Sequence, residues 1–392
     1  MIWKYMRLDI SKNDHTLSSP PKRHLRPEQT RSKGKLLIHG IAHDDFSSND
    51  YLGYAWDEQL IAIGKEALDT YGTGSTGSRL LTGDQALFHE LESAVADFKN
   101  KEASLLFNSG YQANLSILDT LTGAEDVIFA DKLAHASLID GARMSGAKLI
   151  RFAHNDAGHL RILLEKHRPQ YQNAMIVTES VFSMDGDRAP LAELVDLKYT
   201  YECALLVDEA HATGLFGPTG AGWVEALGLS ADVDLIMGTF GKALGSAGAY
   251  LACPQAVKDQ FIQTCRGFIY TTALPPATVA VNLAAIRLVQ SEAFRRTELI
   301  DRTVWLREAL TQTGLTLLGD THIIPIVVGD ESDALRLSDR LKSHRFWILP
   351  IRYPTVPRGQ ARLRLSLTHR HTPEVLERLV DVMTQIYRDT QP

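Results

Sequence analysis

Two side chains of opposite charge follow neighbouring apolar runs of the sequence. Asp208 ends the run that begins at Cys203, and Lys242 lies 34 residues further on, just after the run 234–239. This separation is about one βαβ unit, so both side chains can flank the same pocket at adjacent strand ends. A lysine and an acid around one ligand suggest pyridoxal phosphate, because the lysine can form a Schiff base while the acid keeps the pyridine nitrogen protonated. An ordinary buried ion pair is the alternative, and for these two residues alone it is the better one.

Residues after other apolar runs add groups that could bind the phosphate of such a cofactor. Ser109, Gly110 and Tyr111 lie where an expected strand passes into a helix, and free backbone amides at a helix N-terminus bind anions. Thr239, three residues before Lys242, could add a hydroxyl to the same phosphate. These positions favour a cofactor over an ion pair, because all of them fall at one expected sheet edge.

Two histidines and a serine fall at the same edge. His135 could stack on a flat ring, and His211, three residues after Asp208, could reach a ring hydroxyl. Either histidine alone is more often a satisfied surface or core residue. Ser183 closely precedes an Asp-Gly pair, which is typical of a turn. The combination, and no single residue, carries the prediction.

A glycine-rich segment offers a competing interpretation. Residues 72–77, Gly-Thr-Gly-Ser-Thr-Gly, match the GxGxxG pattern of a nicotinamide-binding or flavin-binding dehydrogenase. That pattern requires a preceding strand, whereas residues 59–71 have helical periodicity, and the segment lacks the Lys-Ser/Thr ending of a P-loop. We therefore interpret it as a flexible loop that permits close approach of its backbone.

The composition narrows the class of protein. The chain has 392 residues, of which 44% are hydrophobic and 22% charged; this is typical of a globular protein and long enough for two domains. Lys and Arg number 41 against 47 Asp and Glu, so the net charge of −6 predicts no binding to nucleic acid or to an anionic membrane. Three scattered cysteines indicate neither a disulfide framework nor a metal site. The first ten residues lack a signal-peptide core and no apolar run has membrane-spanning length, so we expect a cytoplasmic protein.

Short apolar runs alternate with amphipathic ones between about residues 50 and 290, which indicates a mostly parallel sheet covered by helices. Expected strands are 103–107, 126–130, 148–152, 174–179, 203–208, 234–239 and 248–253, and expected helices are 84–99, 111–121, 156–167, 191–201 and 254–265. A helical pattern over 277–313, broken near residue 291, leads to strands at 323–328, 346–350 and 362–367 and helices at 332–344 and 373–388. The sequence thus predicts an α/β fold with a large domain at residues 49–290 and a small α+β domain at residues 291–392. An arm or first helix is expected at residues 1–48.

That N-terminal segment is basic on balance. Residues 22–35 hold six Lys and Arg against the single acid Glu28. Charged runs are usually solvated, so a plain solvent-exposed arm is one interpretation. The other is a lid that contacts an anionic substrate.

Four motifs together resemble the α-oxoamine synthases, which are pyridoxal-phosphate enzymes of fold type I, the aspartate-aminotransferase-like fold. The motifs are FSSNDYLG at residues 46–53, GTGSTGSR at 72–79, DEAH at 208–211 and TFGK at 239–242. The resemblance extends from about residue 45 to 370. It implies an acyltransferase that condenses an amino acid with an acyl thioester and releases carbon dioxide.

The resemblance also implies roles for the matching residues. Lys242 would form the Schiff base, Asp208 would pair with the pyridine nitrogen, and His135 would stack on the ring, so these three would be catalytic. Further cofactor contacts are implied for His211, Gly110, Tyr111, Thr239 and Ser183. Substrate contacts are implied for Arg364 and Asn49 at the amino-acid carboxylate, for Thr355 at the acyl group, and for Arg23, with Arg26 as the alternative, at the far carboxylate of the acyl chain. Arg362 is expected on the opposite side of its strand, in a structural role.

Residues 183–194, 269–276 and 354–357 resemble most closely those family members that use L-alanine and a pimeloyl thioester, carried by coenzyme A or an acyl carrier protein. Glycine acetyltransferase, 5-aminolaevulinate synthase and sphingoid-base synthases are the alternatives within the family. A dehydrogenase and a catalytically silent subunit are alternatives outside it. The resemblance implies a homodimer with active sites at its interface, and no metal is expected.

Overall fold

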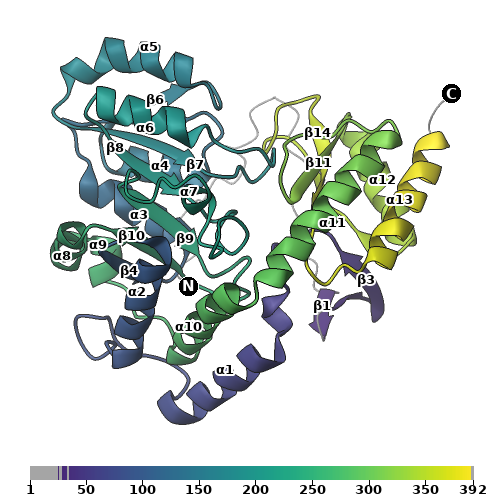
Figure 1. The fold of residues 1–392 in the computed structure, drawn as a ribbon, viewed down its shortest axis with the longest axis horizontal. Coiled ribbons are helices and arrows are strands. Elements are labelled where there is room, and N and C mark those ends of the chain that lie inside the picture. Colours follow the sequence, from purple (N-terminus) through teal and green to yellow (C-terminus); the bar gives the residue numbers. More distant parts are fainter. Residues whose placement is uncertain (1–24, 26–28, 33–34, 390–392) are drawn as a thin grey trace, which may run out of the picture.

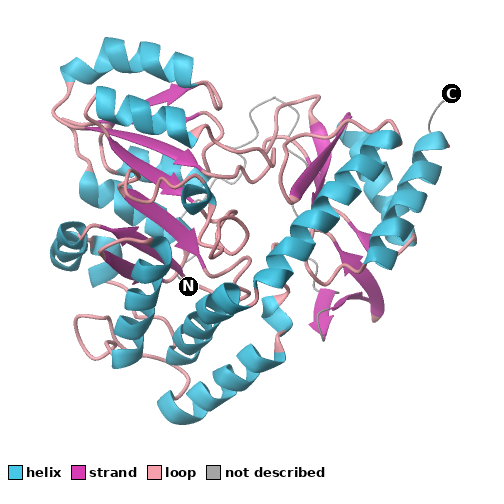
Figure 2. Cartoon of the chain, in the orientation of Figure 1, coloured by secondary structure: helices cyan, strands magenta, loops and turns pink. Residues whose placement is uncertain are grey.

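The computed structural model describes residue 25, residues 29–32 and residues 35–389. Arg23 and Arg26, the expected contacts of the acyl carboxylate, lie outside the described residues. The described chain forms a larger body around a seven-stranded sheet and a smaller body around two short sheets (Figure 1). Helices cover the large sheet on both faces and one side of the smaller body (Figure 2).

The large sheet has the strand order β4-β10-β9-β8-β7-β5-β6. Pairs β5–β6, β5–β7, β7–β8 and β8–β9 are parallel, whereas β10 is antiparallel to both of its neighbours. Its strands are β4 (Ala103–Phe107), β5 (Val127–Asp131), β6 (Lys148–Phe152), β7 (Ala174–Glu179), β8 (Ala204–Asp208), β9 (Leu235–Thr239) and β10 (Ala249–Cys253). The inner strands are buried on both faces, which explains why they appear in the sequence as continuous apolar runs. The expected mostly parallel sheet is confirmed, and each strand begins within one residue of its predicted start.

Two hydrophobic cores lie against the sheet, one containing Leu91, Leu160 and Val279 and the other Ile117 and Leu138. The helices of the larger body are α1 (Glu58–Tyr71), α2 (Ala86–Lys99), α3 (Gly110–Leu121), α4 (Ala136–Met144), α5 (Ala157–His167), α6 (Leu191–Thr200), α7 (Trp223–Ala226), α8 (Gln255–Thr264), α9 (Arg266–Ile269) and α10 (Pro276–Ser291), with short turns η3 (Tyr54–Trp56) and η4 (Arg168–Gln170). Helix α4 is absent from the sequence-based prediction.

The smaller body holds the sheet β11-β14-β13, the helices that pack on it, and a second sheet β1-β2-β3-β12. Its strands are β11 (Ile323–Gly329), β12 (Phe346–Trp347), β13 (Pro350–Ile351) and β14 (Ala361–Ser366), and its helices are α11 (Ala293–Gln312), α12 (Glu331–Ser343) and α13 (Pro373–Arg388). Helix α13 buries Leu376, Leu379, Met383 and Ile386, which share one helical face. The expected break near Ser291 is present, since α10 ends there and α11 begins at Ala293. The domain boundaries at 48/49 and 290/291 stay predictions.

The described part of the N-terminal segment forms strands, so the expectation of a first helix is wrong for it. Strands β1 (Gln29–Ser32), β2 (Lys35–Ile38) and β3 (Ile41–Asp45) form an antiparallel sheet, and β3 pairs in parallel with β12. The segment is therefore held to the C-terminal third of the chain.

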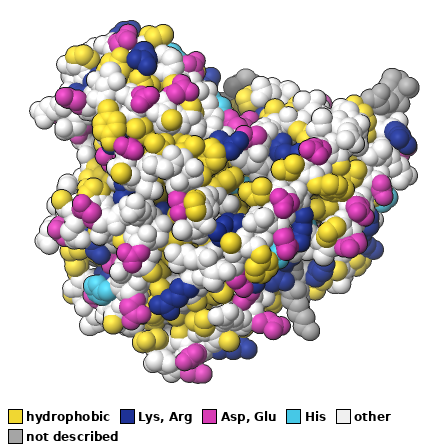
Figure 3. All heavy atoms as spheres, viewed as in Figure 1, with side chains coloured by type: hydrophobic (Ala, Val, Ile, Leu, Met, Phe, Trp, Pro, Cys, Tyr) yellow, Lys and Arg dark blue, Asp and Glu magenta, His cyan; other side chains and the backbone are white. Residues whose placement is uncertain are grey.

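The surface agrees with the small net charge. On the face drawn in Figure 3, basic and acidic side chains are interspersed. Among the described residues no helix is long and apolar enough to cross a membrane, and in the same ranges no cluster of potential metal ligands occurs. Cys203, Cys253 and Cys265 are buried free thiols.

Candidate active site

Four parallel strands end at one edge of the large sheet with a polar residue. Asp131 ends β5, Glu179 ends β7, Asp208 ends β8 and Thr239 ends β9. Lys242 follows three residues after Thr239 in a turn closed by a hydrogen bond from Gly245 N–H to the Lys242 carbonyl, 2.9 Å. The parallel register thus gathers at one edge the groups that the sequence places after separate apolar runs.

Asp208 is held in place by two donors. Its Oδ2 accepts a hydrogen bond of 2.9 Å from Nδ2 of Asn114 on α3, and its Oδ1 accepts one of 2.9 Å from Ala210 N–H. The side chain is buried, and Lys242 directs its Nζ at His211 Nε2, 2.7 Å away. Within the described residues Asp208 and Lys242 therefore do not form the direct ion pair of the alternative interpretation.

The surroundings of Lys242 favour the neutral form of its amine. Burial lowers the pKa of Lys242 to about 8, although the carboxyls of Asp208 and Glu179 act in the other direction; the charge of Arg364 lowers it further. A lysine with this pKa is partly unprotonated near neutral pH. It can therefore act as a nucleophile or as a base.

The residues expected on the phosphate side lie at the N-terminus of α3. Ser109 caps the helix, since its side chain accepts a hydrogen bond of 3.2 Å from Gln112 N–H, and Gly110 begins it. A Cβ at Gly110 would be 4.0 Å from Cβ of Thr239, so the end of β9 borders this helix terminus. The Thr239 hydroxyl donates to Gly248 O at 2.9 Å and accepts from Gly241 N–H at 3.1 Å. Tyr111 is half exposed and donates through its hydroxyl to Asp140.

His135 precedes α4 and caps it, because its Nδ1 accepts a hydrogen bond of 3.3 Å from Ser137 N–H. Its ring lies edge-on to Tyr111, with ring centroids 6.4 Å apart. Burial lowers the pKa of His135, against the opposing effect of the Asp208 carboxylate. A neutral imidazole at this sheet edge is suited to stacking on a flat ring.

The smaller body contributes Arg364 from β14. Its Nε donates to Ser183 O at 2.5 Å, Nη1 donates to Ser366 Oγ at 2.7 Å, and both Nη atoms point to Asn49 Oδ1 at 3.2 Å. The structure thus brings together Arg364, Asn49 and the Ser183 backbone. A forked guanidinium of this kind matches a carboxylate.

The expectation that Arg362 lies on the opposite side of its strand from Arg364 is wrong. Arg362 donates to Met184 O and, at 2.7 Å, to Asp185 Oδ1, so it contacts the same segment as Arg364. Residues two apart in a strand share a face. Arg362 therefore lies on the side of β14 that faces the larger body.

Thr355 is not brought to this cluster by any contact in the structure. It is exposed in the loop between β13 and β14, and its N–H donates to Arg352 O at 2.9 Å, within that loop. Its expected contact with an acyl group stays a prediction.

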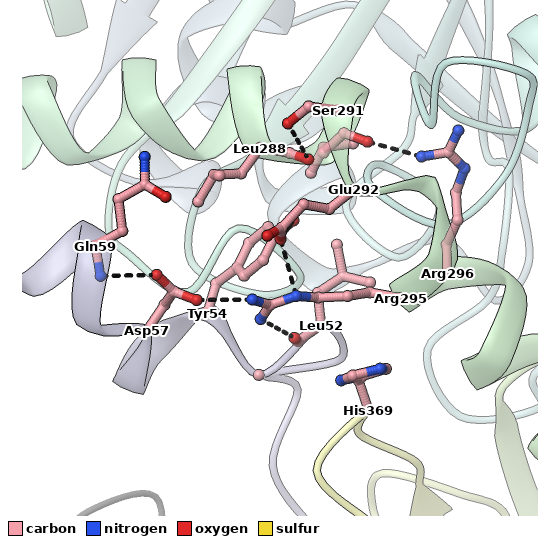
Figure 4. Close-up of polar contacts among 12 residues, drawn as sticks. Leu52, Tyr54, Asp57, Gln59, Leu288, Ser291, Glu292, Arg295, Arg296 and His369 are labelled. Carbon is pink, nitrogen blue, oxygen red and sulfur yellow. Dashed lines mark hydrogen bonds and ion pairs between the residues drawn. The ribbon is translucent and has the colours of Figure 1, made fainter.

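The junction of α10 and α11 holds the segment 46–53, which carries Asn49, in place. Arg295 donates to Leu52 O at 3.3 Å and to Asp57 Oδ2 at 2.8 Å, and it pairs with Glu292 at 2.9 Å (Figure 4). The Tyr54 hydroxyl donates to Glu292 Oε2 at 3.2 Å. These contacts anchor the segment to the helices that connect the two bodies.

The glycine-rich loop follows helix α1, which ends at Tyr71, so it lacks the strand that a dinucleotide-binding motif needs. Gly72 has a positive φ of 78° at the end of that helix. Further along, Ser75 Oγ donates to Leu274 O at 2.5 Å and Gly77 O accepts from Ala273 N–H at 2.9 Å. The dehydrogenase interpretation therefore fails on local structure.

Several site residues are missing from the sequence-based analysis. Glu179 ends its strand as Asp208 does, and one of its buried oxygens, Oε1, has no hydrogen-bond partner among the described residues. Burial, reinforced by the Asp208 charge, raises the pKa of Glu179 well above its usual value. Its place after an apolar run is a signal that could have found it. Asn114 and Tyr51 carry no such signal, because their contacts depend on how distant segments pack.

A cationic bridge lies beside this edge. His154 directs Nδ1 at Asp131 Oδ1, 2.9 Å away, and Nε2 at Asp187 Oδ2, 2.8 Å away. Two carboxylate acceptors require both ring nitrogens to be protonated. The two carboxylates raise the pKa of His154 to about 10, overcoming partial burial, so the ring is an imidazolium that links β5 to the segment after β7.

A buried ion pair supports the turn that follows Asp208. Lys99 Nζ lies 2.8 Å from Glu209 Oε2 and also donates to Thr213 Oγ1 at 3.0 Å and to Ala221 O. Glu209 Oε1 accepts a hydrogen bond of 2.9 Å from Val224 N–H. Both charged side chains are fully enclosed, which makes the pair strongly dependent on both partners.

The donor set fits pyridoxal phosphate. It offers helix N-terminal amides for a phosphate, an imidazole for stacking, a fixed carboxylate for a pyridine nitrogen and an amine of lowered pKa.

The sequence has extensive similarity to known proteins. A family described as aminotransferase class I and II matches residues 45–383. The chain is 44% identical over 362 residues to 8-amino-7-oxononanoate synthase of Trichlorobacter lovleyi, covering 92% of both chains.

Solved structures have the same fold. A serine palmitoyltransferase from S. paucimobilis, with pyridoxal phosphate and myriocin bound as an aldimine, is 32% identical, has a TM-score of 0.89, and overlaps 92% of both chains. The 8-amino-7-oxononanoate synthase of Francisella tularensis is 29% identical with a TM-score of 0.77, covering 88% of this chain and 98% of that chain. The fold is that of the type I pyridoxal-phosphate enzymes.

Proposed function

This chain belongs to the class I and II aminotransferase family and within it to the α-oxoamine synthases, and we propose that it is an 8-amino-7-oxononanoate synthase of biotin biosynthesis. The reaction joins L-alanine to the pimeloyl group of a coenzyme A or acyl-carrier-protein thioester, with release of the thiol and carbon dioxide. The observation that carries the proposal is the 44% identity over 92% of the chain to a synthase of that name.

The cofactor would be held by residues from several elements. Gly110 and Tyr111 would donate backbone N–H groups to its phosphate, Asp208 would accept from the ring nitrogen, and Lys242 would hold it covalently. His135 would stack on the ring. When bound, pyridoxal phosphate supplies an electron-withdrawing ring that stabilises negative charge on the amino-acid α-carbon.

Other side chains bind the substrate, remove its proton and stabilise charge. Arg364 binds the carboxylate of alanine through its two Nη atoms, the positions that now face Asn49 Oδ1. Lys242, with its pKa of about 8, removes the α-proton as the neutral amine. The carboxylate of Asp208, fixed by Asn114, would favour a protonated ring nitrogen in the bound cofactor.

A sphingoid-base synthase is a second candidate, and one observation favours it. The TM-score is higher to serine palmitoyltransferase than to the Francisella synthase, 0.89 against 0.77, whereas sequence identity favours the synthase reaction. The TM-score measures similarity of the backbone fold, whereas side chains in the site select the substrate. We therefore give the identity more weight.

The test compares four substrate pairs with one preparation of the cofactor-loaded protein. These are L-alanine with pimeloyl-CoA, glycine with acetyl-CoA, glycine with succinyl-CoA, and L-serine with palmitoyl-CoA. Thiol release and product mass should show turnover chiefly with the first pair, and Lys242→Ala should remove it. Preferential turnover of any other pair would refute the assignment.

A further inference from the structure

A chain of hydrogen bonds joins His135 to Asp208 through two buried side chains. Nδ2 of Asn114 donates to Asp208 Oδ2 at 2.9 Å and to Ser137 Oγ at 3.0 Å. Ser137 Oγ lies 2.7 Å from His135 Nδ1. The chain therefore links the residue that would stack on the cofactor ring to the residue that would pair with the ring nitrogen.

Close packing of α3 against α4 brings Asn114 and Ser137 together. The two helices lie side by side (Figure 1), and both side chains are fully buried. A Cβ on Gly141, one turn after Ser137, would lie 2.9 Å from Asn114 O, so the glycine permits the close approach. Asn114 Oδ1 has no hydrogen-bond partner among the described residues, so the amide acts only through the two hydrogens on Nδ2.

The direction of each hydrogen bond follows from the end of the chain at Asp208. A carboxylate only accepts, so the Asn114 atom that faces it must be the nitrogen. The second hydrogen of that nitrogen goes to Ser137 Oγ. The Ser137 hydroxyl then has its own hydrogen to donate, and within the described part of the chain its acceptor is His135 Nδ1.

These hydrogen bonds determine which nitrogen of His135 carries the hydrogen. Nδ1 accepts from the Ser137 hydroxyl and also, at 3.3 Å, from Ser137 N–H, so it carries none. Burial lowers the pKa of His135, which keeps the ring neutral near pH 7. The single hydrogen of the ring is therefore on Nε2, and this nitrogen can only donate.

We propose that Ser137 is a positioning residue that fixes the orientation of His135 and its Nε2–H tautomer. This inference rests on the proposed stacking of His135 on the ring of pyridoxal phosphate. A hydroxyl bound to one edge of the imidazole restrains rotation about the Cβ–Cγ bond of His135. Stacking on a flat ring requires the imidazole to keep one plane, so this restraint supports the stacking.

The same contacts oppose protonation of His135. An imidazolium must donate from Nδ1, and Ser137 Oγ could accept that hydrogen only by turning its own hydrogen away from its acceptor. Ser137→Ala removes this restraint without a change of charge. It leaves in place the ionisable groups that face His135, which are Asp208 on β8, Glu179 on β7, His211 after β8, Asp140 on α4, Tyr111 on α3 and Lys242, the expected anchor of the cofactor.

The experiment is NMR spectroscopy of the full-length chain loaded with pyridoxal phosphate and isotope-labelled in its histidines. His135 is assigned by the signals that disappear in His135→Gln. At pH 8 the wild-type spectrum should show a hydrogen on Nε2 and none on Nδ1. In a titration from pH 5 to 8.5, Ser137→Ala should raise the midpoint of His135 by about half to one pH unit, because the neutral ring loses one accepted hydrogen bond.

Visible circular dichroism of the bound cofactor depends on how its ring contacts the protein, and per unit absorbance it should fall in Ser137→Ala toward the value in His135→Gln. Ser104→Ala removes another fully buried serine hydroxyl, one that donates to Glu92 O at 2.7 Å, and should leave the midpoint and the dichroism unchanged.

Three results would overturn the proposal: a wild-type hydrogen on Nδ1, an equal midpoint in the wild type and Ser137→Ala, or unchanged dichroism in Ser137→Ala. Unchanged dichroism in His135→Gln would refute the stacking on which the proposal rests. None of these measurements requires turnover, so failure of the proposed synthase reaction is seen separately in the product assay.

Discussion

The imidazolium of His154 should make a pH-dependent contribution to stability. Its two nitrogens bridge Asp131 and Asp187 at 2.9 Å and 2.8 Å, which raises the pKa of His154 from 6.5 to about 10. At about 1.36 kcal/mol per pH unit this corresponds to roughly 5 kcal/mol. Because the side chain is 22% exposed to solvent, we reduce the expected contribution to roughly 2–3 kcal/mol.

The direction in which this stability contribution changes with pH follows from proton binding. Between the unfolded pKa near 6.5 and the folded pKa near 10, the folded chain holds a proton that the unfolded chain has lost. The contribution is therefore complete below about pH 6.5 and declines as the pH rises through about 10. His154→Gln retains one amide donor but cannot be cationic, so it should lose this contribution.

The assay is urea unfolding of wild type and His154→Gln at intervals from pH 6 to 10.5. The difference in unfolding free energy between the two proteins cancels the titration of groups that they share. It should fall from roughly 2–3 kcal/mol at pH 6 to near zero above pH 10. His344→Gln, which changes an exposed histidine at the end of α12, serves as the control substitution. A constant difference for His154→Gln across this range would refute the cationic bridge.

Two other substitutions have expected outcomes. Glu209→Gln leaves the Lys99 ammonium enclosed with only neutral acceptors, so the unfolding free energy should fall by about 3–5 kcal/mol. The double variant Lys99→Met/Glu209→Gln should be less destabilised than Glu209→Gln alone, because it no longer encloses an unpaired charge. Denaturant unfolding of both variants measures the two free energies. Arg364→Lys keeps the charge but loses the fork, so the KM for L-alanine should rise by roughly tenfold or more, and an unchanged KM in steady-state assays would contradict the carboxylate role.

Much of the large sheet can be predicted from the sequence, because its inner strands are buried on both faces and appear as apolar runs. The positions after those runs then locate Asp208, Thr239 and Lys242 at one edge. The contact between Tyr51 and His211 cannot be predicted in this way. It depends on segments 160 residues apart that meet only in the folded chain.

The elements missed by the sequence-based prediction have physical explanations. Helix α4 is short and contains Gly141, which weakens a helical pattern; a Cβ there would lie 2.9 Å from Asn114 O, so the glycine permits close packing of α3 and α4. Strands β1 to β3 carry the charged residues Arg31, Lys35 and Asp45 in place of an apolar alternation. They pair with one another, and β3 also pairs with the distant strand β12. Arg362 and Arg364 share a face of β14 because side chains in a strand alternate with a period of two residues.

The pairing of β3 with β12 has a consequence for synthesis on the ribosome. Ser47 contacts Trp347, which is 300 residues later in the chain. At about 5–20 residues per second, roughly 15–60 s pass between translation of β3 and translation of its partner β12. The seven-stranded sheet can form during that interval, because its strands lie between residues 103 and 253. The carboxylate fork, which needs both Asn49 and Arg364, is thus among the last parts of the nascent enzyme to be assembled.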